Sequence, residues 1–339
     1  MESFDNQIVV SIRCLTYNHA PYIRQCLDGF VMQKTNFRFE AIVHDDASTD
    51  GTQDIIREYA EKYPDIIKPI YETENQYSKR DGSLRRVIDS AMSPTSKYIA
   101  ICEGDDYWTD PQKLQKQVDF LEGHSDYTMT CHRVKCFSES DQKFIREDYC
   151  YEKSQDIRVK DIIYRTGLFI PTCSIIYRKE VKDNYPDYCT KCLVGDYPLQ
   201  IMCAMKGKTY YFNDLMGVYR VNNNNSWMGK QVWRKFSKER VEVIRSQLNM
   251  FKGFAKDYPQ WEKQFHNKEV DHILRFMPDK IGVSKEDYKK YVEEFVEEIN
   301  NFTLFEKLDM KIRMCNNQYV KSLYRKIYLK QFYTKKKYI

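Results

Sequence analysis

Three carboxylates stand close together in the segment EGDD, which contains Glu103, Asp105 and Asp106. The segment follows the apolar run YIAIC at residues 98–102, whose length and composition are typical of a buried β-strand. Carboxylates this close repel one another unless a positive charge lies among them. A hard cation such as Mg²⁺ or Mn²⁺ prefers oxygen ligands, and Glu103 and Asp105 have the spacing to supply two. The alternative is that the acids cap the helix that follows.

A second acidic pair, Asp45 and Asp46, ends another apolar segment, FEAIVHDD. The first 125 residues alternate between strand-like and helix-like patterns, which predicts a parallel sheet covered by helices on both faces. Ligands of such sheets collect beyond the carboxyl ends of the strands. We therefore expect both acidic segments to meet at one edge of the sheet. The alternative for Asp45 and Asp46 is a turn and helix cap.

The hydrophobic pattern divides the chain into three parts. Strands are expected at residues 8–17, 39–46, 66–72 and 97–106, separated by helices. A mixed or antiparallel region with a helix at residues 197–207 follows, and its strands are expected at residues 127–137, 174–179 and 209–221. The remainder is helical in pattern, with residues 285–302 as one helix. The predicted domains are 1–225, with halves 1–125 and 126–225, and a helical region 226–339 with a basic tail.

The chain has 339 residues, of which 42% are hydrophobic and 30% charged, a composition typical of a globular protein. No apolar run approaches the roughly 20 residues that a membrane-spanning helix requires. The N-terminus lacks the basic and apolar regions of a signal peptide. Eleven scattered cysteines fit a reducing compartment better than a disulfide framework. We therefore expect a cytoplasmic location.

Two cysteine pairs could suggest a zinc site. The segments CTKC and CHRVKC lack the partner pairs of a zinc ribbon, so zinc is not expected.

The end of the chain has a different charge from the rest. Residues 310–339 contain nine Lys or Arg and no acid, interleaved with Tyr, Leu, Ile and Phe. One interpretation is a solvated charged helix end, and another is peripheral attachment to the anionic inner face of the cell membrane. Nucleic-acid binding is not expected, because no recognised module accompanies the basic residues.

The quoted segments resemble a known family. VSIRCLTYNHAPYIRQCLDGFVMQ, FEAIVHDDASTDGTQDIIREYA, YIAICEGDDYWTDPQKLQKQVDFL and VGDYPLQIMCAMKGKTYYFNDLMGVYRV, in this order, resemble the inverting family 2 glycosyltransferases of bacteria. The resemblance covers about residues 8–222. It implies the GT-A fold, a Rossmann-like and mostly parallel mixed sheet flanked by helices, here with a helical C-terminal extension.

The resemblance also implies roles for particular residues. EGDD matches the family's DXD-type motif, so Asp105 would bind Mn²⁺ or Mg²⁺ and Glu103 stands where Asp is commoner. The donor nucleotide would contact residues from several segments: Leu15, Thr16 and Tyr17 at the base pocket, Asp46 bonded to the base, Asp106 beside the metal ligand, Arg85 and Arg86 on phosphate or sugar, and Tyr219 and Arg220 near the diphosphate. A salt bridge to an acid of the body is the alternative for Arg220.

Asp196, in VGDYPLQ, matches the family's general base. A positioned carboxylate can take the proton of an acceptor hydroxyl as that hydroxyl attacks the anomeric carbon. The competing interpretation is a helix N-cap ahead of Pro198, and the two roles are compatible. Trp227 would close over the donor, stack on an acceptor sugar, or belong to the core.

The expected function is therefore metal-dependent, inverting transfer of a hexosyl or N-acetylhexosaminyl group from a nucleotide-sugar, with UDP-sugars favoured. The acceptor would be a hydroxyl of a glycan or lipid-linked oligosaccharide in surface polysaccharide biosynthesis. One alternative is a sugar nucleotidyltransferase, but LTYNHAPYIRQ lacks the glycine-rich loop that such enzymes need. Another is a non-catalytic nucleotide- or carbohydrate-binding protein. The helical C-terminal third could also form a homodimer interface.

Overall fold

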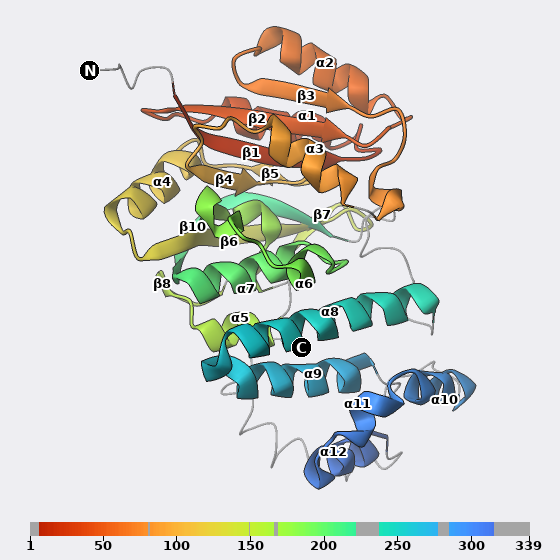
Figure 1. Ribbon diagram of the computed structural model, residues 1–339. Helices are drawn as coiled ribbons and strands as arrows, with labels where there is room; N and C mark the ends of the chain where they lie inside the picture. The colour runs from red at the N-terminus through yellow and green to blue at the C-terminus, as the bar shows by residue number, and fades with distance from the viewer. Residues whose placement is uncertain are drawn as a thin grey trace. The chain divides into compact units, whose positions relative to one another are not determined.

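The computed structural model describes residues 7–80, 82–148, 150–165, 169–221, 237–276 and 285–314. The chain divides into two compact units, residues 1–230 and 231–339. Figure 1 shows the mixed α/β architecture of the first unit and the helices of the second. The division predicted at 225/226 falls between described segments and stays a prediction.

The first unit is built on one mixed sheet of ten described strands, eight of which run in the order β3-β2-β1-β4-β9-β6-β10-β5, while β7 pairs with β6 and β8 with β10. Strands β1 to β4 are mutually parallel where they pair, β9 runs antiparallel to β4 and β6, and β10 runs parallel to β6. The mostly parallel α/β class predicted from the sequence is confirmed. The strands are β1 (Ile8–Thr16), β2 (Arg38–Asp45), β3 (Ile67–Tyr71), β4 (Tyr98–Ile101), β5 (Tyr107–Trp108), β6 (Tyr127–Ser138), β7 (Lys143–Asp148), β8 (Gln155–Asp156), β9 (Ile176–Arg178) and β10 (Lys208–Val221).

The side chains of β1 point alternately into the apolar core and toward the opposite face of the sheet. Val10, Ile12 and Cys14 are fully buried in one apolar cluster with α1, α2 and α4. The alternate residues of the strand, among them Arg13 and Leu15, point to the opposite face, as the two-residue period of a strand requires. The helices of this unit are α1 (Ile23–Val31), α2 (Thr52–Lys62), α3 (Ser83–Ala91), α4 (Lys113–Gly123), α5 (Val159–Tyr164), α6 (Asp187–Thr190) and α7 (Asp196–Lys206).

Lys113, at the start of α4, is a charged residue inside this core. Its side chain is fully buried, its Nζ has no hydrogen-bond partner, and Nζ lies 4.0 Å from the ring centroid of Trp108. Burial lowers the pKa of the Lys113 amine to about 7, because the charged form loses its hydration. The neutral amine therefore predominates in the folded protein above about pH 7.

We expect Lys113→Met to change how stability depends on pH. The folded pKa lies below the ordinary value of 10.5, so the unfolded chain binds the extra proton between about pH 7 and 10.5. The wild type should therefore gain about 2 kcal/mol of unfolding free energy relative to Lys113→Met between about pH 7 and 9. Urea unfolding at several pH values measures this. Lys116→Met, on the same helix but paired with Asp110, is the control; parallel profiles for wild type and Lys113→Met would contradict the prediction.

The second unit consists of helices in its described part: α8 (Lys238–Asp257), α9 (Glu262–Phe276), α10 (Lys285–Glu294), α11 (Val296–Asn300) and α12 (Leu304–Met314). Residues 285–302, expected as one helix, form α10 and α11 with a break at Phe295. The Phe295 ring is fully buried against Tyr291 and under the Arg245 guanidinium. The break therefore lies at a buried ring. The helical periodicity of residues 285–302 alone does not reveal it. Among the described helices, none is long and apolar enough to cross a membrane.

Candidate active site

The acidic segments meet at the carboxyl ends of β1, β2 and β4. The Gly104 amide donates to the Leu15 carbonyl at 2.8 Å, which joins EGDD to the end of β1. The Asp46 amide donates to the Thr16 carbonyl at 2.9 Å, which joins the end of β2 to the same place. The sequence therefore predicts correctly that these segments converge, and the parallel pairing of β1 with both neighbours is the physical reason.

Close packing at Gly104 holds the acidic turn, residues 103–106, against β1. A Cβ atom at this position would lie 2.9 Å from His19 Nδ1 and 2.9 Å from Thr16 Cβ. Both contacts are shorter than van der Waals separation, so the backbone can approach this closely only without a side chain. The glycine of EGDD therefore sets how near the carboxylates lie to the end of β1.

We expect Gly104→Ala to destabilise the protein by about 1–3 kcal/mol, as overpacking of a tight interior does. It should also weaken nucleotide binding, because the turn that carries Glu103 and Asp105 must move away from β1. Gly123→Ala is the matched control, since a Cβ there meets nothing within 4 Å. Thermal unfolding and nucleotide titration of both variants test this, and equal behaviour of the two alanines would contradict the role given to Gly104.

Three carboxylates interact electrostatically at this edge: Glu103 and Asp105 from EGDD, and Asp196 from a segment distant in sequence. Burial, together with the negative charges of Asp105 and Asp196, raises the pKa of Glu103 to about 7, and the Arg13 guanidinium acts in the opposite direction. Burial likewise raises the pKa of Asp196, and Arg13 again acts in the opposite direction. The site thus gathers more negative charge than Arg13 alone neutralises, which favours binding of a further cation.

Asp105 is the carboxylate best placed to ligate a metal. Within the described residues its side chain makes no hydrogen bond or ion pair, whereas Asp106 is buried and its Oδ1 accepts from the Arg220 amide at 2.8 Å. No group of three or more His, Cys, Asp or Glu in the described segments could hold an ion by itself. A Mg²⁺ or Mn²⁺ held by one or two carboxylates, with substrate phosphates completing its shell, fits this donor set.

Asp196 begins α7 and lies in the same electrostatic cluster. Its Oδ1 accepts a hydrogen bond from the amide of the next residue, Tyr197, at 2.8 Å. The N-cap of α7 is Gly195 and no side chain caps the helix, so the interpretation of Asp196 as an N-cap is wrong. A hydrogen bond with Thr172 also favours its ionised form. The remaining acceptor capacity of the carboxylate is available to a substrate hydroxyl, because an ionised carboxylate offers about four lone-pair positions. The structural contact and the predicted catalytic role are therefore compatible.

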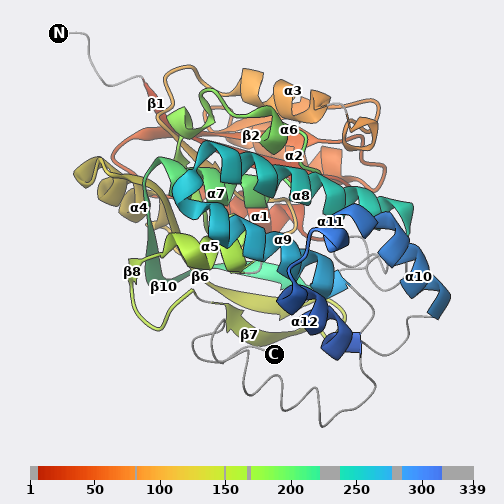
Figure 2. The same cartoon turned by 60° about the horizontal axis from the view of Figure 1, so that its bottom comes forward.

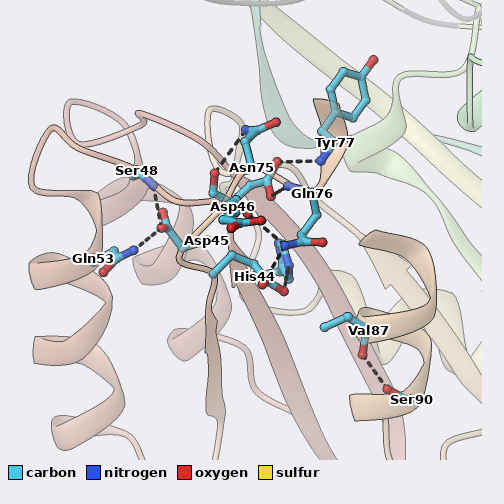
Figure 3. A network of polar contacts seen from close by, with 12 residues as sticks. His44, Asp45, Asp46, Ser48, Gln53, Asn75, Gln76, Tyr77, Val87 and Ser90 are labelled. Carbon is cyan, nitrogen blue, oxygen red and sulfur yellow. Dashed lines mark hydrogen bonds and ion pairs between the residues drawn. The ribbon is translucent and has the colours of Figure 1, made fainter. Parts of the chain in front are cut away.

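Asp46 is held by the loop that follows β3. Its Oδ1 accepts from the Gln76 amide at 2.6 Å and its Oδ2 accepts from the Tyr77 amide at 3.1 Å (Figure 3). Asp45 is also engaged, since its Oδ1 accepts from Ser48 and Gln53. The loop partners of Asp46 fix its orientation at the edge of the sheet. Its predicted bond to a nucleotide base stays a prediction.

Arg220 fastens the end of β10 to the acidic turn. Its Nε lies 2.7 Å from Glu139 Oε1 in a nearly buried ion pair, which is the alternative stated for this residue. Its other nitrogens donate to the Asp105 carbonyl and to Gln25. Each of these contacts orders residues around EGDD, so Arg220 supports the turn whether or not it also contacts a diphosphate.

The remaining predicted donor contacts occupy different surroundings. Burial, together with the charges of Asp106 and Asp105, raises the pKa of the Tyr219 hydroxyl. Tyr17 is 47% exposed beyond the end of β1, while Thr16 is buried and its hydroxyl has no hydrogen-bond partner.

The two predicted arginines lie on α3. Arg85 stacks on Tyr185 and pairs with Asp89 on α3. Arg86 also lies on α3. Trp227 and residues 315–339 lie outside the described residues.

Two residues at the site were not selected from the sequence. Arg13 lies between hydrophobic positions of β1, and the alternation of that strand was the signal that could have placed it on the site face. The other residue is His19: it packs on Gly104, its Nδ1 has no hydrogen-bond partner, and Asp105 is among the charges acting on it. Burial nevertheless lowers the pKa of His19, so its imidazole is neutral at neutral pH.

Comparisons with known proteins agree with this geometry. Residues 11–185 match the family described as Glycosyl transferase family 2, so the chain belongs to that family. An uncharacterized protein of Mycobacterium tuberculosis is 37% identical over 249 residues, 72% of this chain and 69% of the relative. TuaG of Bacillus subtilis, named as a teichuronic acid biosynthesis glycosyltransferase, is 27% identical over 247 residues, 70% of this chain and 91% of the relative. The protein is thus a glycosyltransferase.

Solved structures share the fold at lower sequence identity. S. aureus TarS in complex with UDP-GlcNAc aligns with a TM-score of 0.50 and 17% identity, covering 86% of this chain and 92% of TarS. The mannosyltransferase PcManGT of Pyrobaculum calidifontis, in complex with GDP-Man and Mn²⁺, has a TM-score of 0.50 and 17% identity, with 94% of this chain and 84% of PcManGT covered. The GT-A architecture expected from the sequence is confirmed.

Proposed function

We propose that this glycosyltransferase moves a sugar from a nucleotide-diphosphate donor, with UDP-sugars favoured, to a hydroxyl of a glycan or lipid-linked acceptor, with inversion at the anomeric carbon. The observation that carries the proposal is the gathering of Glu103, Asp105 and Asp196 with Arg13 at one edge of the sheet. A site with excess negative charge and an unengaged Asp105 suits a donor that arrives with a divalent cation.

The roles follow from the surroundings of each side chain. Asp105, assisted by Glu103, would hold Mn²⁺ or Mg²⁺, which when bound stabilises the charge of the departing diphosphate. Asp196 would accept the proton of the acceptor hydroxyl, and its raised pKa makes it a stronger base than an exposed carboxylate. Attack from the face opposite the diphosphate in a single displacement inverts the configuration.

The donor would lie across the ends of β1 and β2. Leu15, Thr16 and Tyr17 would line the base pocket, where the unpartnered Thr16 hydroxyl can bond a base edge. Asp46, fixed by the loop after β3, would accept from the base. Tyr219 would contact the diphosphate, Arg220 and Asp106 would hold the turn in place, and Arg85 and Arg86 would contact phosphate or sugar.

Two comparisons support a nucleotide-sugar donor without choosing its base, because TarS holds UDP-GlcNAc and PcManGT holds GDP-Man on the same fold. The name of TuaG supports a place in surface polysaccharide synthesis. A sugar nucleotidyltransferase is disfavoured by the first loop, TYNHAP, which has no glycine to admit a triphosphate.

The test is a panel of UDP-, GDP- and dTDP-sugars, each measured with Mn²⁺, Mg²⁺ or EDTA. We expect one nucleotide to raise the unfolding temperature only when metal is present, and the matching donor to release its diphosphate slowly. Stabilisation by a nucleotide without turnover on any acceptor or water would favour the binding-protein alternative. Absence of stabilisation by every nucleotide, with and without metal, would overturn the proposal.

A further inference from the structure

Two exposed tyrosine rings lie on either side of Asp46. Of the Tyr, Phe and Trp side chains that the structure describes in the first unit, only Tyr17, Tyr77 and Phe144 are exposed. Strand β2 lies between β1 and β3 in the sheet. Asp46 follows β2, Tyr17 follows β1, and Tyr77 belongs to the loop after β3. The order of the strands therefore places the carboxylate between the two rings.

Backbone contacts hold both tyrosines next to Asp46. In the ladder of β1 with β2, Thr16 pairs with Asp45, and the Asp46 amide donates to the Thr16 carbonyl at 2.9 Å. Tyr17 and Asp46, the next residues of the two strands, therefore leave the sheet side by side. On the other side, the Tyr77 amide donates to Asp46 Oδ2 at 3.1 Å. This contact uses only the backbone of Tyr77, and Figure 3 shows its ring directed away from the hydrogen bond.

The loop after β3 is attached to the end of β2 at further points. Gln76 Nε2 donates to Glu72 Oε2 at 3.1 Å, and Glu72 Oε1 lies 3.2 Å from Nε2 of the fully buried His44. Asn75 Nδ2 donates to the Asp46 carbonyl at 3.2 Å. Helix α3, which follows the loop in sequence, also contacts β2 (Figures 1 and 2). These contacts fix the backbone from which the second ring projects.

The distance between the two sides suits a planar ring. Neighbouring strands lie about 4.8 Å apart, so β1 and β3 lie about 10 Å apart across β2. A planar group between two rings needs about 7–8 Å, because carbon atoms in contact lie about 3.5–4 Å apart. A nucleobase above Asp46 can therefore contact a ring on each face while its polar edge reaches the carboxylate. Aromatic rings bind bases in this way whatever the base, because every base has a π face.

We propose that Tyr77 forms the second side of the base site and stacks on the nucleobase opposite Tyr17, with Asp46 at the polar edge of the base. The inference rests on the proposed function, because it requires the nucleotide of the donor to lie at this edge of the sheet. Tyr77 lies outside the four segments through which the chain resembles its family, so only the structure brings it to the site. Its ring contributes to the affinity for the nucleotide, and the hydrogen bonds of Asp46 contribute to the choice of base.

The test is calorimetric titration of the full chain, in Mn²⁺, with UDP, GDP and dTDP, and with inorganic diphosphate as the ligand that lacks a base. Tyr77→Ala removes the ring but keeps the amide that Asp46 accepts, whereas Tyr77→Phe keeps the ring. Phe144→Ala is the matched control, since Phe144 is 52% exposed on β7 and Tyr77 is 50% exposed. We expect Tyr77→Ala to weaken binding of the nucleotide that wild type prefers by about 5- to 150-fold and to leave diphosphate binding unchanged. Tyr77→Phe and Phe144→Ala should match wild type.

Equal nucleotide affinities of wild type and Tyr77→Ala would overturn the inference and leave the proposed function standing. A parallel loss of diphosphate affinity, or an equal loss in Tyr77→Phe, would also overturn it, because neither is an effect of a ring on a base. Thermal unfolding should be the same for all variants, since the ring is half exposed and the backbone contact with Asp46 is kept. A wild type that binds no nucleotide at all would contradict the proposed function itself.

Discussion

Asp196→Asn is expected to lower the transfer rate by about 100- to 10,000-fold, the range that removal of a general base produces. The variant should fold normally, because the amide oxygen of Asn can still accept the Tyr197 N–H that Asp196 Oδ1 accepts at 2.8 Å. Donor affinity should change little, since Asp196 acts on the acceptor hydroxyl. Initial rates with a saturating donor, together with nucleotide titration, separate the two effects.

Asp187→Asn is the matched control for this experiment. Asp187 is likewise the first residue of a helix, but its side chain is 85% exposed and pairs with Lys191. We expect wild-type rates from it. If Asp196→Asn lost donor binding in parallel with rate, or lost stability while keeping its rate, Asp196 would be a helix-terminal acid and the base would have to be sought elsewhere.

Asp105→Asn should remove metal-dependent donor binding. Lewis-acid stabilisation of a departing diphosphate is worth several kcal/mol, and about 1.4 kcal/mol corresponds to a factor of ten, so kcat/KM should fall at least about 100-fold. In EDTA the same variant should be at least as stable as wild type, because one of the charges acting on Glu103 is gone. Thermal unfolding with and without Mn²⁺ measures both effects.

The opposite stability result would identify a different role for the turn. Were Asp105 a structural cap, Asp105→Asn would lower the unfolding temperature in EDTA and leave the response of the protein to Mn²⁺ intact. Asp54→Asn provides the comparison, since Asp54 is an acid near the start of α2 whose side chain is 80% exposed. It should reproduce wild-type behaviour under every condition.

Much of the fold could be predicted because its signals are local. The apolar runs ending at Asp45 and at Glu103 are strands, and the order of strands and helices places their carboxyl ends together. The break at Phe295 could not be predicted, because the residues before and after it keep one helical period. The backbone at Phe295 leaves the helical conformation, and there the ring packs under Arg245 of α8, a contact between segments about 50 residues apart.

What the sequence by itself determined is the chemistry available: which acids end which strands, where a glycine interrupts them, and how many basic residues close the chain. What only the tertiary structure decided is the partner of each group. The charge of Arg13 acts on Glu103 and Asp196, and Arg220 binds Glu139 across 81 residues of chain. Residue type and period are properties of a short segment, whereas partners are set by packing between segments far apart in sequence.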